Sequence, residues 1–165
     1  MVVHDLAAMC GLNVPKAEAV KFSKLGTTFL IKRFDRDGEK RIHFSSAMTM
    51  LGKRDGASAE DGSSYLEMVS FLKANGAKPQ RDLQELWKRI VFSMSVSNTD
   101  DHFRNHGFIL SDTGWELSPL YDVNPDIYGE YLSLNVDKDN SSIDFSLAIS
   151  AAPFYGLNEK RLLRW

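Results

Sequence analysis

Apolar side chains recur every three or four positions in two segments near the middle of the chain. The first segment opens with a capping box formed by Ser64 and Glu67 and ends before Gly76. In both segments this spacing places the apolar side chains on one face of a helix. Two core-packed helices are predicted, with apolar positions Tyr65, Met68, Val69 and Leu72 in the first and Leu83, Leu86, Trp87, Ile90, Val91 and Met94 in the second.

Strand patterns lie on both sides of these helices. The β-branched and aromatic residues of AEAVKFSK and TTFLIKRF flank a turn at Leu25 and Gly26. Farther along, HGFILS and WELSPLYDV are separated by the turn sequence DTG. Both arrangements predict β-hairpins. A further strand is expected over YLSLNV, followed by a helix from about Ile143 and another over NEKRLLRW.

Shorter elements are expected in the first third of the chain. Val2, Val3, Leu6, Ala7 and Cys10 form one helical stripe, and a second short helix is expected over FSSAMTML. The segment GKRDGASAEDGSS is small and polar, so it is the best candidate for a flexible loop or linker.

Composition indicates one globular domain. The chain has 165 residues, of which 43% are hydrophobic and 25% charged, and its formal charge of -2 provides no global basic field for nucleic acid. Cys10 is the single cysteine, which excludes an intrachain disulfide and a cysteine-based zinc cluster. It favours a reducing compartment, so a cytoplasmic location is expected. No apolar run approaches the roughly 20 residues of a membrane-spanning helix.

The segment SNTDDHFRNHGFIL carries the strongest chemical signal. Asp100 and Asn105 are five positions apart in a loop between the second long helix and a hairpin, and Asp122 follows that hairpin. Phosphoryl transfer needs a carboxylate that orients and deprotonates the attacking hydroxyl, together with oxygen ligands for Mg²⁺. Asp100 suits the first task, and Asn105 and Asp122 suit the second.

Two other interpretations of this segment stay open at this point. Asp-rich sequences such as NTDD are common in solvated turns and helix caps. A zinc site would use His102 and His106, but their spacing of four positions falls where no helix is expected.

The same residues resemble a known family. SNTDDHFRNHGFIL followed by WELSPLYDVNP is similar to the signature of the HipA-like serine/threonine kinases, and IKRFDR resembles their hinge. The resemblance implies that Asp100 is the catalytic aspartate, that Asn105 and Asp122 bind Mg²⁺, and that His102 organises the loop near the nucleotide. It also implies transfer of the γ-phosphate of ATP to a Ser or Thr hydroxyl of a protein substrate.

The resemblance extends to nucleotide contacts. Lys32 and Phe34 would contact adenine mainly through the backbone, Asp35 would approach the ribose, and Tyr121 would sit beside Asp122. Phe34 could equally pack in a core, and Asp35 could cap a turn. The sequence departs from the family where Arg104 replaces a Lys and where Lys32 replaces the hinge Glu.

The implied fold is α+β and protein-kinase-like, with a mostly helical C-terminal lobe and small β-hairpins. Residues 1–34 would be a remnant of the smaller lobe, and residues 35–165 the larger lobe, truncated at its C-terminus. A glycine-rich phosphate-binding segment and a strand lysine are expected upstream in this family. Their absence predicts weak activity, with the small lobe supplied by another chain as one explanation, and apolar surface exposed around the opening helix and hairpin.

Partners follow from the resemblance as well. Family members act as toxins paired with a HipB-like DNA-binding antitoxin, so contact with DNA would be indirect, and no membrane is involved. A different class of function is a catalytically inactive, kinase-like binding module that contacts an antitoxin or another chain. Asp101 is expected to be a bystander in the loop.

Overall fold

The computed structural model describes residues 1–126, 128–158 and 162. Its helices are α1 (Val2–Met9), α2 (Ala47–Met50), α3 (Tyr65–Asn75), α4 (Pro79–Ser95) and α5 (Phe145–Ala151), with 3₁₀ helices η1 (Ala59–Asp61) and η2 (Ala152–Tyr155). Its strands are β1 (Ala17–Ser23), β2 (Gly26–Ile31), β3 (Arg36–Asp37), β4 (Lys40–Arg41), β5 (Phe44–Ser46), β6 (Gly107–Ser111) and β7 (Gly114–Leu117).

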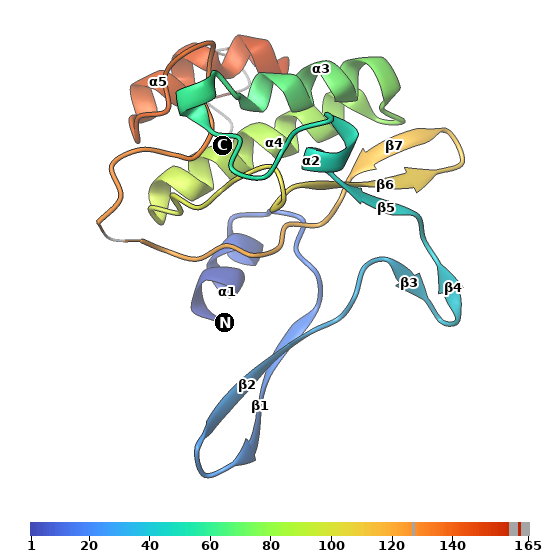
Figure 1. The fold of residues 1–165 in the computed structure, drawn as a ribbon. Helices are drawn as coiled ribbons and strands as arrows, with labels where there is room; N and C mark the ends of the chain where they lie inside the picture. The colour runs from blue at the N-terminus through green and yellow to red at the C-terminus, as the bar shows by residue number, and fades with distance from the viewer. Residues whose placement is uncertain (127, 159–161, 163–165) are drawn as a thin grey trace.

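The helices α3 and α4 form the centre of the molecule, with α5 packed beside them (Figure 1). The predicted capping box is present, because Ser64 Oγ accepts from the Leu66 N–H and Glu67 Oε1 accepts from the Ser64 N–H. Gly76 ends α3, as predicted. The predicted apolar faces are buried in one core together with Phe108 and Leu117 of the sheet, although Val91 is only partly buried.

A three-stranded antiparallel sheet in the order β5-β6-β7 covers one end of these helices (Figure 1). The β6–β7 hairpin confirms the prediction around DTG, but β7 ends at Leu117. The rest of that segment, through Val123, is an extended connection that passes below the helices. Its direction is set in part by Arg89, a buried α4 residue whose Nη2 donates to the Ser118 carbonyl at 2.6 Å.

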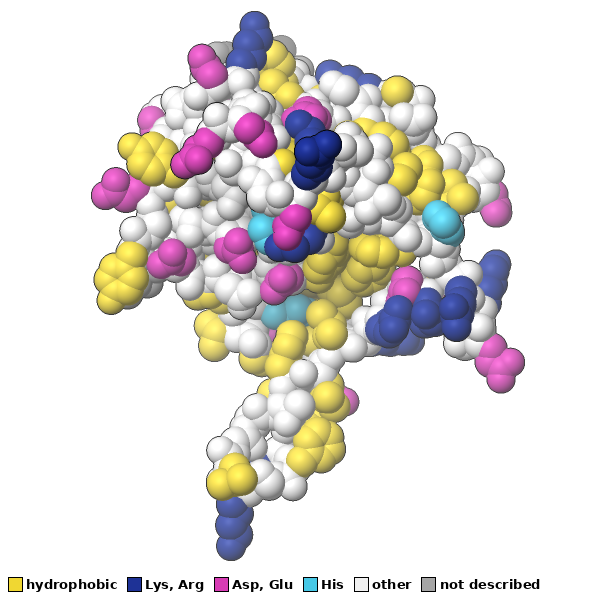
Figure 2. All heavy atoms as spheres, in the orientation of Figure 1, with side chains coloured by type: hydrophobic (Ala, Val, Ile, Leu, Met, Phe, Trp, Pro, Cys, Tyr) yellow, Lys and Arg dark blue, Asp and Glu magenta, His cyan; other side chains and the backbone are white. Residues whose placement is uncertain are grey.

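The β1–β2 hairpin confirms the turn predicted at Leu25 and Gly26, and it extends away from the rest of the molecule (Figure 1). Every residue of β2 is exposed. Figure 2 shows hydrophobic side chains over this hairpin. Phe22 of β1 is 70% exposed, and Phe29 of β2 is 43% exposed. The hairpin therefore presents the apolar surface that the sequence predicts.

The opening helix α1 is also where predicted, but its apolar stripe is mostly exposed. Ala7 is buried, whereas Val2 is 73% exposed and Leu6 is 41% exposed. Ala7 forms a second, small core with Leu12, Phe92 and Leu120, which joins α1 to the end of α4.

Three predictions of secondary structure need correction or lie outside the described residues. The strand expected over residues 131–136 is wrong, because that segment makes only isolated bridges, from Tyr131 to Ser142 and from Asn135 to Ser64. The expected loop at 52–64 is anchored, since it contains η1 and Ala59 N–H donates to the Ser133 carbonyl at 2.7 Å. The helix predicted over NEKRLLRW falls almost entirely outside the described residues.

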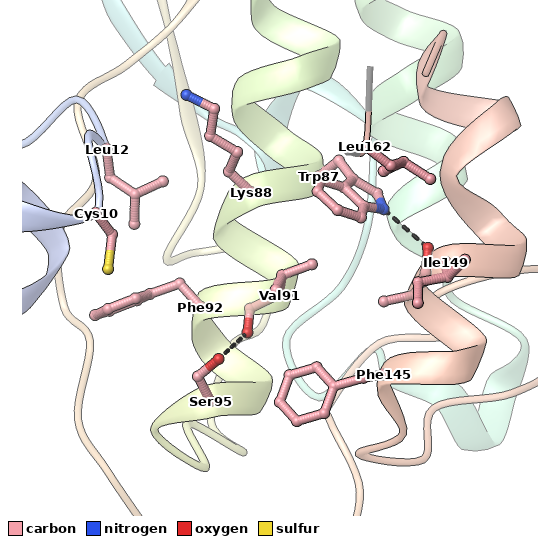
Figure 3. A pocket seen from close by; sticks show the side chains of 11 residues that line it. Cys10, Leu12, Trp87, Lys88, Val91, Phe92, Ser95, Phe145, Ile149 and Leu162 are labelled. Carbon is pink, nitrogen blue, oxygen red and sulfur yellow. Dashed lines mark hydrogen bonds between the residues drawn. The ribbon is translucent and has the colours of Figure 1, made fainter. Parts of the chain in front are cut away.

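An apolar cavity of about 700 Å³ lies between α4, α5 and the residues that follow α1 (Figure 3). Trp87 closes one side, and its Nε1 donates to the Ala148 carbonyl at 2.9 Å. Phe145 and Ile149 of α5 line the cavity on the same side as Trp87 and are more than half exposed, and Cys10 and Leu12 lie on the opposite side (Figure 3). Within the described ranges, no helix is both long enough and apolar enough to cross a membrane.

Candidate active site

The loop that carries Asp100, His102 and Asn105 begins where α4 ends. Ser97 has a positive φ of 51° and reverses the chain after the helix. Asn98, which is 1% exposed, then donates its backbone N–H to the Ser93 carbonyl at 2.8 Å. A left-handed residue that leads back to a carbonyl of the last turn closes a helix C-terminus. The loop therefore starts from a fixed point on α4.

Side chains along this loop alternate between solvent and the interior. The side chain of Asp100 is 80% exposed and that of Arg104 is 49% exposed. The odd-numbered residues Asp101, Phe103 and Asn105 are 2%, 2% and 4% exposed. Asp100 thus faces solvent, while its neighbour Asp101 faces inward.

Asp101 connects the loop to the helical core. Its carboxylate lies 2.9 Å from His106 Nε2 and accepts hydrogen bonds from Tyr65 Oη at 2.8 Å and Ser93 Oγ at 3.2 Å. His106 Nε2 is within ion-pair distance of this carboxylate, although its N–H direction does not meet hydrogen-bond geometry. Burial raises the pKa of Asp101, but the charge of His106 and the hydrogen-bond donors outweigh it and hold the pKa below its ordinary value.

The three residues assigned to catalysis are close to one another. His102 Nε2 lies 3.6 Å from Asp100 Oδ1, and Asn105 Nδ2 donates to the Asp100 carbonyl oxygen at 2.9 Å. A backbone hydrogen bond closes a turn over the same residues, since the Asn105 N–H donates to the His102 carbonyl at 2.9 Å. The bond made by the Asn105 amide nitrogen fixes the amide plane and leaves its oxygen for another ligand.

The segment that holds Tyr121 and Asp122 lies against the same loop. Tyr121 Oη donates to the Arg104 carbonyl at 2.7 Å, and Asn124 N–H donates to Asn98 Oδ1 at 3.4 Å. Asp122 is exposed, has a positive φ of 55°, and accepts a hydrogen bond from Asn124 Nδ2 at 3.0 Å. Asp122 is therefore held between two contacts to the catalytic loop. Burial raises the pKa of Tyr121, which keeps its hydroxyl protonated as the donor.

Of the three hinge residues, Phe34 contacts Tyr121, while the contacts of Lys32 and Asp35 are with their own neighbouring segments. The Phe34 ring lies 5.8 Å from the Tyr121 ring and 5.5 Å from the Phe44 ring. Lys32 is exposed, and its backbone N–H extends the β1–β2 ladder to the Lys16 carbonyl. Asp35 is bound by Arg33 and Arg36, and the hydrogen bonds from Arg33 lower the pKa of Asp35 to about 2.

A cavity of about 660 Å³ lies beside Asp122. It is bounded by α1, by Phe29 and Ile31 of β2, and by the segment from Leu120 to Pro125. Cavities of this size are typical of small-molecule and cofactor sites. Its walls join α1 and β2 to Tyr121 and Asp122, whereas the hinge residues Lys32, Phe34 and Asp35 are not among the residues that line it.

The chemistry of the donor set suits Mg²⁺ better than zinc. Asn105 offers a fixed amide oxygen and Asp122 an exposed carboxylate, and hard divalent cations prefer oxygen ligands. Zinc would need a cluster of nitrogen, sulfur or carboxylate ligands, and the described part of the chain holds no group of three such side chains. His102 and His106 are separated as well, since His106 is fully buried against Asp101.

Sequence reasoning missed two buried residues of the loop, Asp101 and Asn98. Asp101 was expected to be a bystander. It does not face solvent, but its contacts with His106, Tyr65 and Ser93 anchor the loop to the core. Phe103 provides the signal that could have found it, because an apolar side chain within a polar loop marks the inward phase that Asp101 and Asn105 share.

Comparison with known proteins identifies the family. The model of the HipA-like C-terminal domain matches residues 1–163. The chain belongs to the HipA-like C-terminal domain family. The serine/threonine-protein kinase toxin HipA of Shewanella oneidensis is 28% identical over 172 residues, which cover 89% of this chain and 40% of that protein. A putative kinase of Haemophilus influenzae is 28% identical over 123 residues, 68% of this chain and 36% of that protein.

Solved structures agree on the fold. HipA of Shewanella oneidensis, in a complex with HipB and its operator DNA, superimposes with a TM-score of 0.81 at 22% identity, over 99% of this chain and 44% of that one. The kinase CtkA of Helicobacter pylori gives 0.65 at 12% identity, over 92% and 73%. The HipA-like chain thus has the expected α+β, kinase-like fold, and it spans 36–40% of the length of its curated relatives.

Proposed function

We propose that the chain is the catalytic segment of a HipA-like protein kinase, which transfers the γ-phosphate of ATP to a Ser or Thr hydroxyl. The observation that carries this proposal is the joint arrangement of Asp100, Asn105 and Asp122. Asp100 is exposed, the Asn105 amide is bound to the Asp100 carbonyl, and Asp122 is held to the same loop through Asn124. The kinase names of the relatives support the same reaction class.

Each residue has a distinct task in this reaction. Asp100 orients the attacking hydroxyl and accepts its proton, and its exposed carboxylate can be reached by a protein substrate. Asn105 and Asp122 hold Mg²⁺ through their oxygens, and His102 keeps the loop in shape beside the nucleotide. Mg²⁺, when bound, neutralises negative charge on the phosphates. Positioning by these fixed side chains supplies much of the catalysis that such a reaction needs.

The nucleotide would lie between the first 34 residues, a part of the smaller lobe, and the larger lobe formed by residues 35–165. In this proposal the backbone near Lys32 and Phe34 contacts adenine, Asp35 approaches the ribose, and Tyr121 lies beside the phosphates. Contact between the Phe34 and Tyr121 rings supports this arrangement, because it links the hinge to the metal-binding segment. The pairing of Asp35 with two arginines leaves Asp35 the weakest of these assignments.

The proposed partners are a protein substrate and a HipB-like antitoxin, through which DNA would be contacted indirectly. The structure of the Shewanella oneidensis relative, which contains HipB and operator DNA, supports the antitoxin.

Substitution of the two carboxylates tests the proposed roles. Asp100→Asn and Asp122→Asn should each abolish transfer of the γ-phosphate of labelled ATP to protein, because one removes the base and the other a metal ligand. Asn also tolerates the left-handed backbone of Asp122, so the fold should persist. Asp112→Asn, in the exposed β6–β7 turn, is the matched control. Transfer at the wild-type rate in both active-site variants would refute the assignment.

The alternative function is a catalytically inactive binding module. Gly11 and Gly26 are the only glycines ahead of the hinge in the 165 residues, which therefore carry no glycine-rich phosphate-binding segment of their own. Both lobes contribute positioning in phosphoryl transfer, so we expect slow turnover from these residues alone. A kinase segment should still bind ATP in a Mg²⁺-dependent manner, whereas a pure binding module should not.

A further inference from the structure

A smaller cavity, of about 180 Å³, lies beside residues 102–104 of the loop and includes charged side chains in its lining. Met48, the residues from Arg54 to Ser58, and Ser133 form its walls together with His102, Phe103 and Arg104 of the loop. His102 links it to the catalytic aspartate, since its Nε2 is 3.6 Å from Asp100 Oδ1. A ligand in this cavity would lie within a few residues of a hydroxyl presented to Asp100.

Hydrogen bonds between the walls hold this cavity open. Met48 N–H donates to the Phe103 carbonyl at 3.2 Å, which joins α2 to the loop. Ser133 bridges the other walls, because its carbonyl accepts from Ala59 N–H at 2.7 Å and its Oγ donates to the Thr99 carbonyl at 2.6 Å. The cavity is therefore preformed, which lowers the cost of ordering a bound group.

The charges that line this cavity are mainly positive. Arg54 and Arg104 both line it, and Asp55 is its one carboxylate. Arg104 Nη1 lies 2.8 Å from Asp55 Oδ1, but these side chains are 49% and 71% exposed, so the pair is weak. Arg54 is exposed, and no carboxylate in the described part of the chain pairs with its guanidinium. The cavity can therefore accept an anion, with Asp55 as a displaceable competitor.

His102 adds a further polar group to this wall. Its Nε2 lies 3.4 Å from Arg104 Nη2, and its Nδ1 is buried without a hydrogen-bond partner. When Nε2 accepts from Arg104, the proton of a neutral imidazole resides on Nδ1. A buried donor without an acceptor is costly and calls for a ligand. An anion bound in the cavity provides an acceptor beside the wall that contains His102.

From these observations we infer that the cavity binds one anionic side chain, a carboxylate or a phosphate, of the polypeptide that presents its Ser or Thr hydroxyl to Asp100. Guanidinium groups match both anions through paired N–H donors. Arg54 and Arg104 would hold the anion, and Asp55 would move aside. This inference rests on the proposed kinase function and names the substrate class, a Ser- or Thr-containing segment with an acidic or phosphorylated residue near the acceptor.

The test is an NMR titration of the full 165-residue chain with four probes. These are inorganic phosphate, a Ser-containing peptide with an Asp beside the acceptor, its phosphoserine counterpart, and its Asn counterpart. The Asp and phosphoserine peptides should shift the signals of Arg54, Gly56 and Arg104, and the Asn peptide should not. Arg54→Gln should lower the affinity for the acidic peptide about tenfold, as expected for loss of one charge-assisted contact. Asp55→Asn should strengthen it by removing the competing carboxylate.

Several results would overturn this inference. One is equal binding of the acidic and Asn peptides. Another is a response to inorganic phosphate with no response to either acidic peptide. The third is a response to a DNA duplex with no response to either acidic peptide. Mg²⁺-dependent ATP binding, measured on the same samples, separates this inference from the proposed function. If ATP binds but Arg54→Gln leaves peptide binding unchanged, the anion site is refuted and the proposed kinase function is not. If ATP does not bind and acidic peptides still need Arg54, the proposed function fails and the anion site stands.

Discussion

Asp100 and Asp101 are adjacent in the sequence and have opposite environments. The Asp100 side chain is 80% exposed, and Asp101 is 2% exposed beside His106, Tyr65 and Ser93. A carboxylate at the surface is free to meet a substrate, while one in the interior must be paired with charge and hydrogen bonds. The loop therefore places two identical side chains in two environments: Asp101 attaches the loop to the core, and Asp100 is open to solvent, where we propose that it acts as the base.

Substitution of each aspartate should separate these tasks. Asp101→Asn removes one partner of a buried ion pair, and we expect the free energy of unfolding to fall by about 3 kcal/mol. Asp100→Asn, the matched control, should change it by less than about 0.5 kcal/mol because the side chain is exposed. Urea unfolding followed by circular dichroism measures both. Equal stability of the two variants would contradict the anchoring role of Asp101.

Acid should weaken the same attachment. The pKa of Asp101 is lower in the folded protein than its ordinary value, so the unfolded state binds a proton more readily as the pH falls. The stability contributed by Asp101 is thus complete above its unfolded pKa and is lost as the pH falls through its folded pKa. The difference in unfolding free energy between wild type and Asp101→Asn should shrink in acid. A difference that stays constant with pH would argue against this linkage.

At the residue scale, Asp100, Asn105 and Asp122 could be proposed as site residues from residue type, spacing and family resemblance, and their roles stay predictions. Asp101 could not, because its role comes from His106 and Tyr65, and the approach of Tyr65 depends on how α3 packs. The alternation with Phe103 indicates that Asp101 faces inward, but the partners that Asp101 meets there are set by tertiary packing.

The elements with strong helical periodicity or clear turn signals formed as predicted, but the strand expected over residues 131–136 did not. The helices α3 and α4 and the hairpins β1–β2 and β6–β7 are present, because their apolar spacing and turns agree locally. Residues 131–136 alternate like a strand, but Leu132, Leu134 and Val136 pack into the helical core without a neighbouring ladder. The alternation of apolar and polar residues there arises because one side of an extended segment is buried against the core.

The exposed hairpin β1–β2 should make the chain self-associate. Its apolar side chains and unpaired strand edges are accessible to another copy, which is the usual hazard of an exposed edge. Replacing both Phe22 and Phe29 with Thr removes the apolar rings and introduces β-branched side chains that favour strands, so it should reduce association, as measured by light scattering at high concentration. Tyr128→Thr, at an 88% exposed position off the hairpin, is the control. A monomeric wild type would contradict this expectation.

At the scale of the whole molecule, the active site depends on contacts between distant segments. Tyr121 reaches the Arg104 carbonyl, Asn124 reaches Asn98, and Phe34 reaches Tyr121. Family resemblance predicted that these segments would meet, but the residues that join them could not be read from spacing. Asn124 is an example, since its two hydrogen bonds orient Asp122, and nothing in the sequence around it distinguishes it from an ordinary turn residue.

The central claim is that these contacts build a site for ATP and Mg²⁺ around Asp122 and Asn105. Calorimetric titration of the chain with ATP, in the presence and absence of Mg²⁺, tests it most directly. We predict weak, saturable binding that requires Mg²⁺, is lost in Asp122→Asn, and is retained in Asp100→Asn, since the base does not hold the metal. Binding that is indifferent to Mg²⁺ or to Asp122→Asn, or no binding by the wild type, would contradict the account.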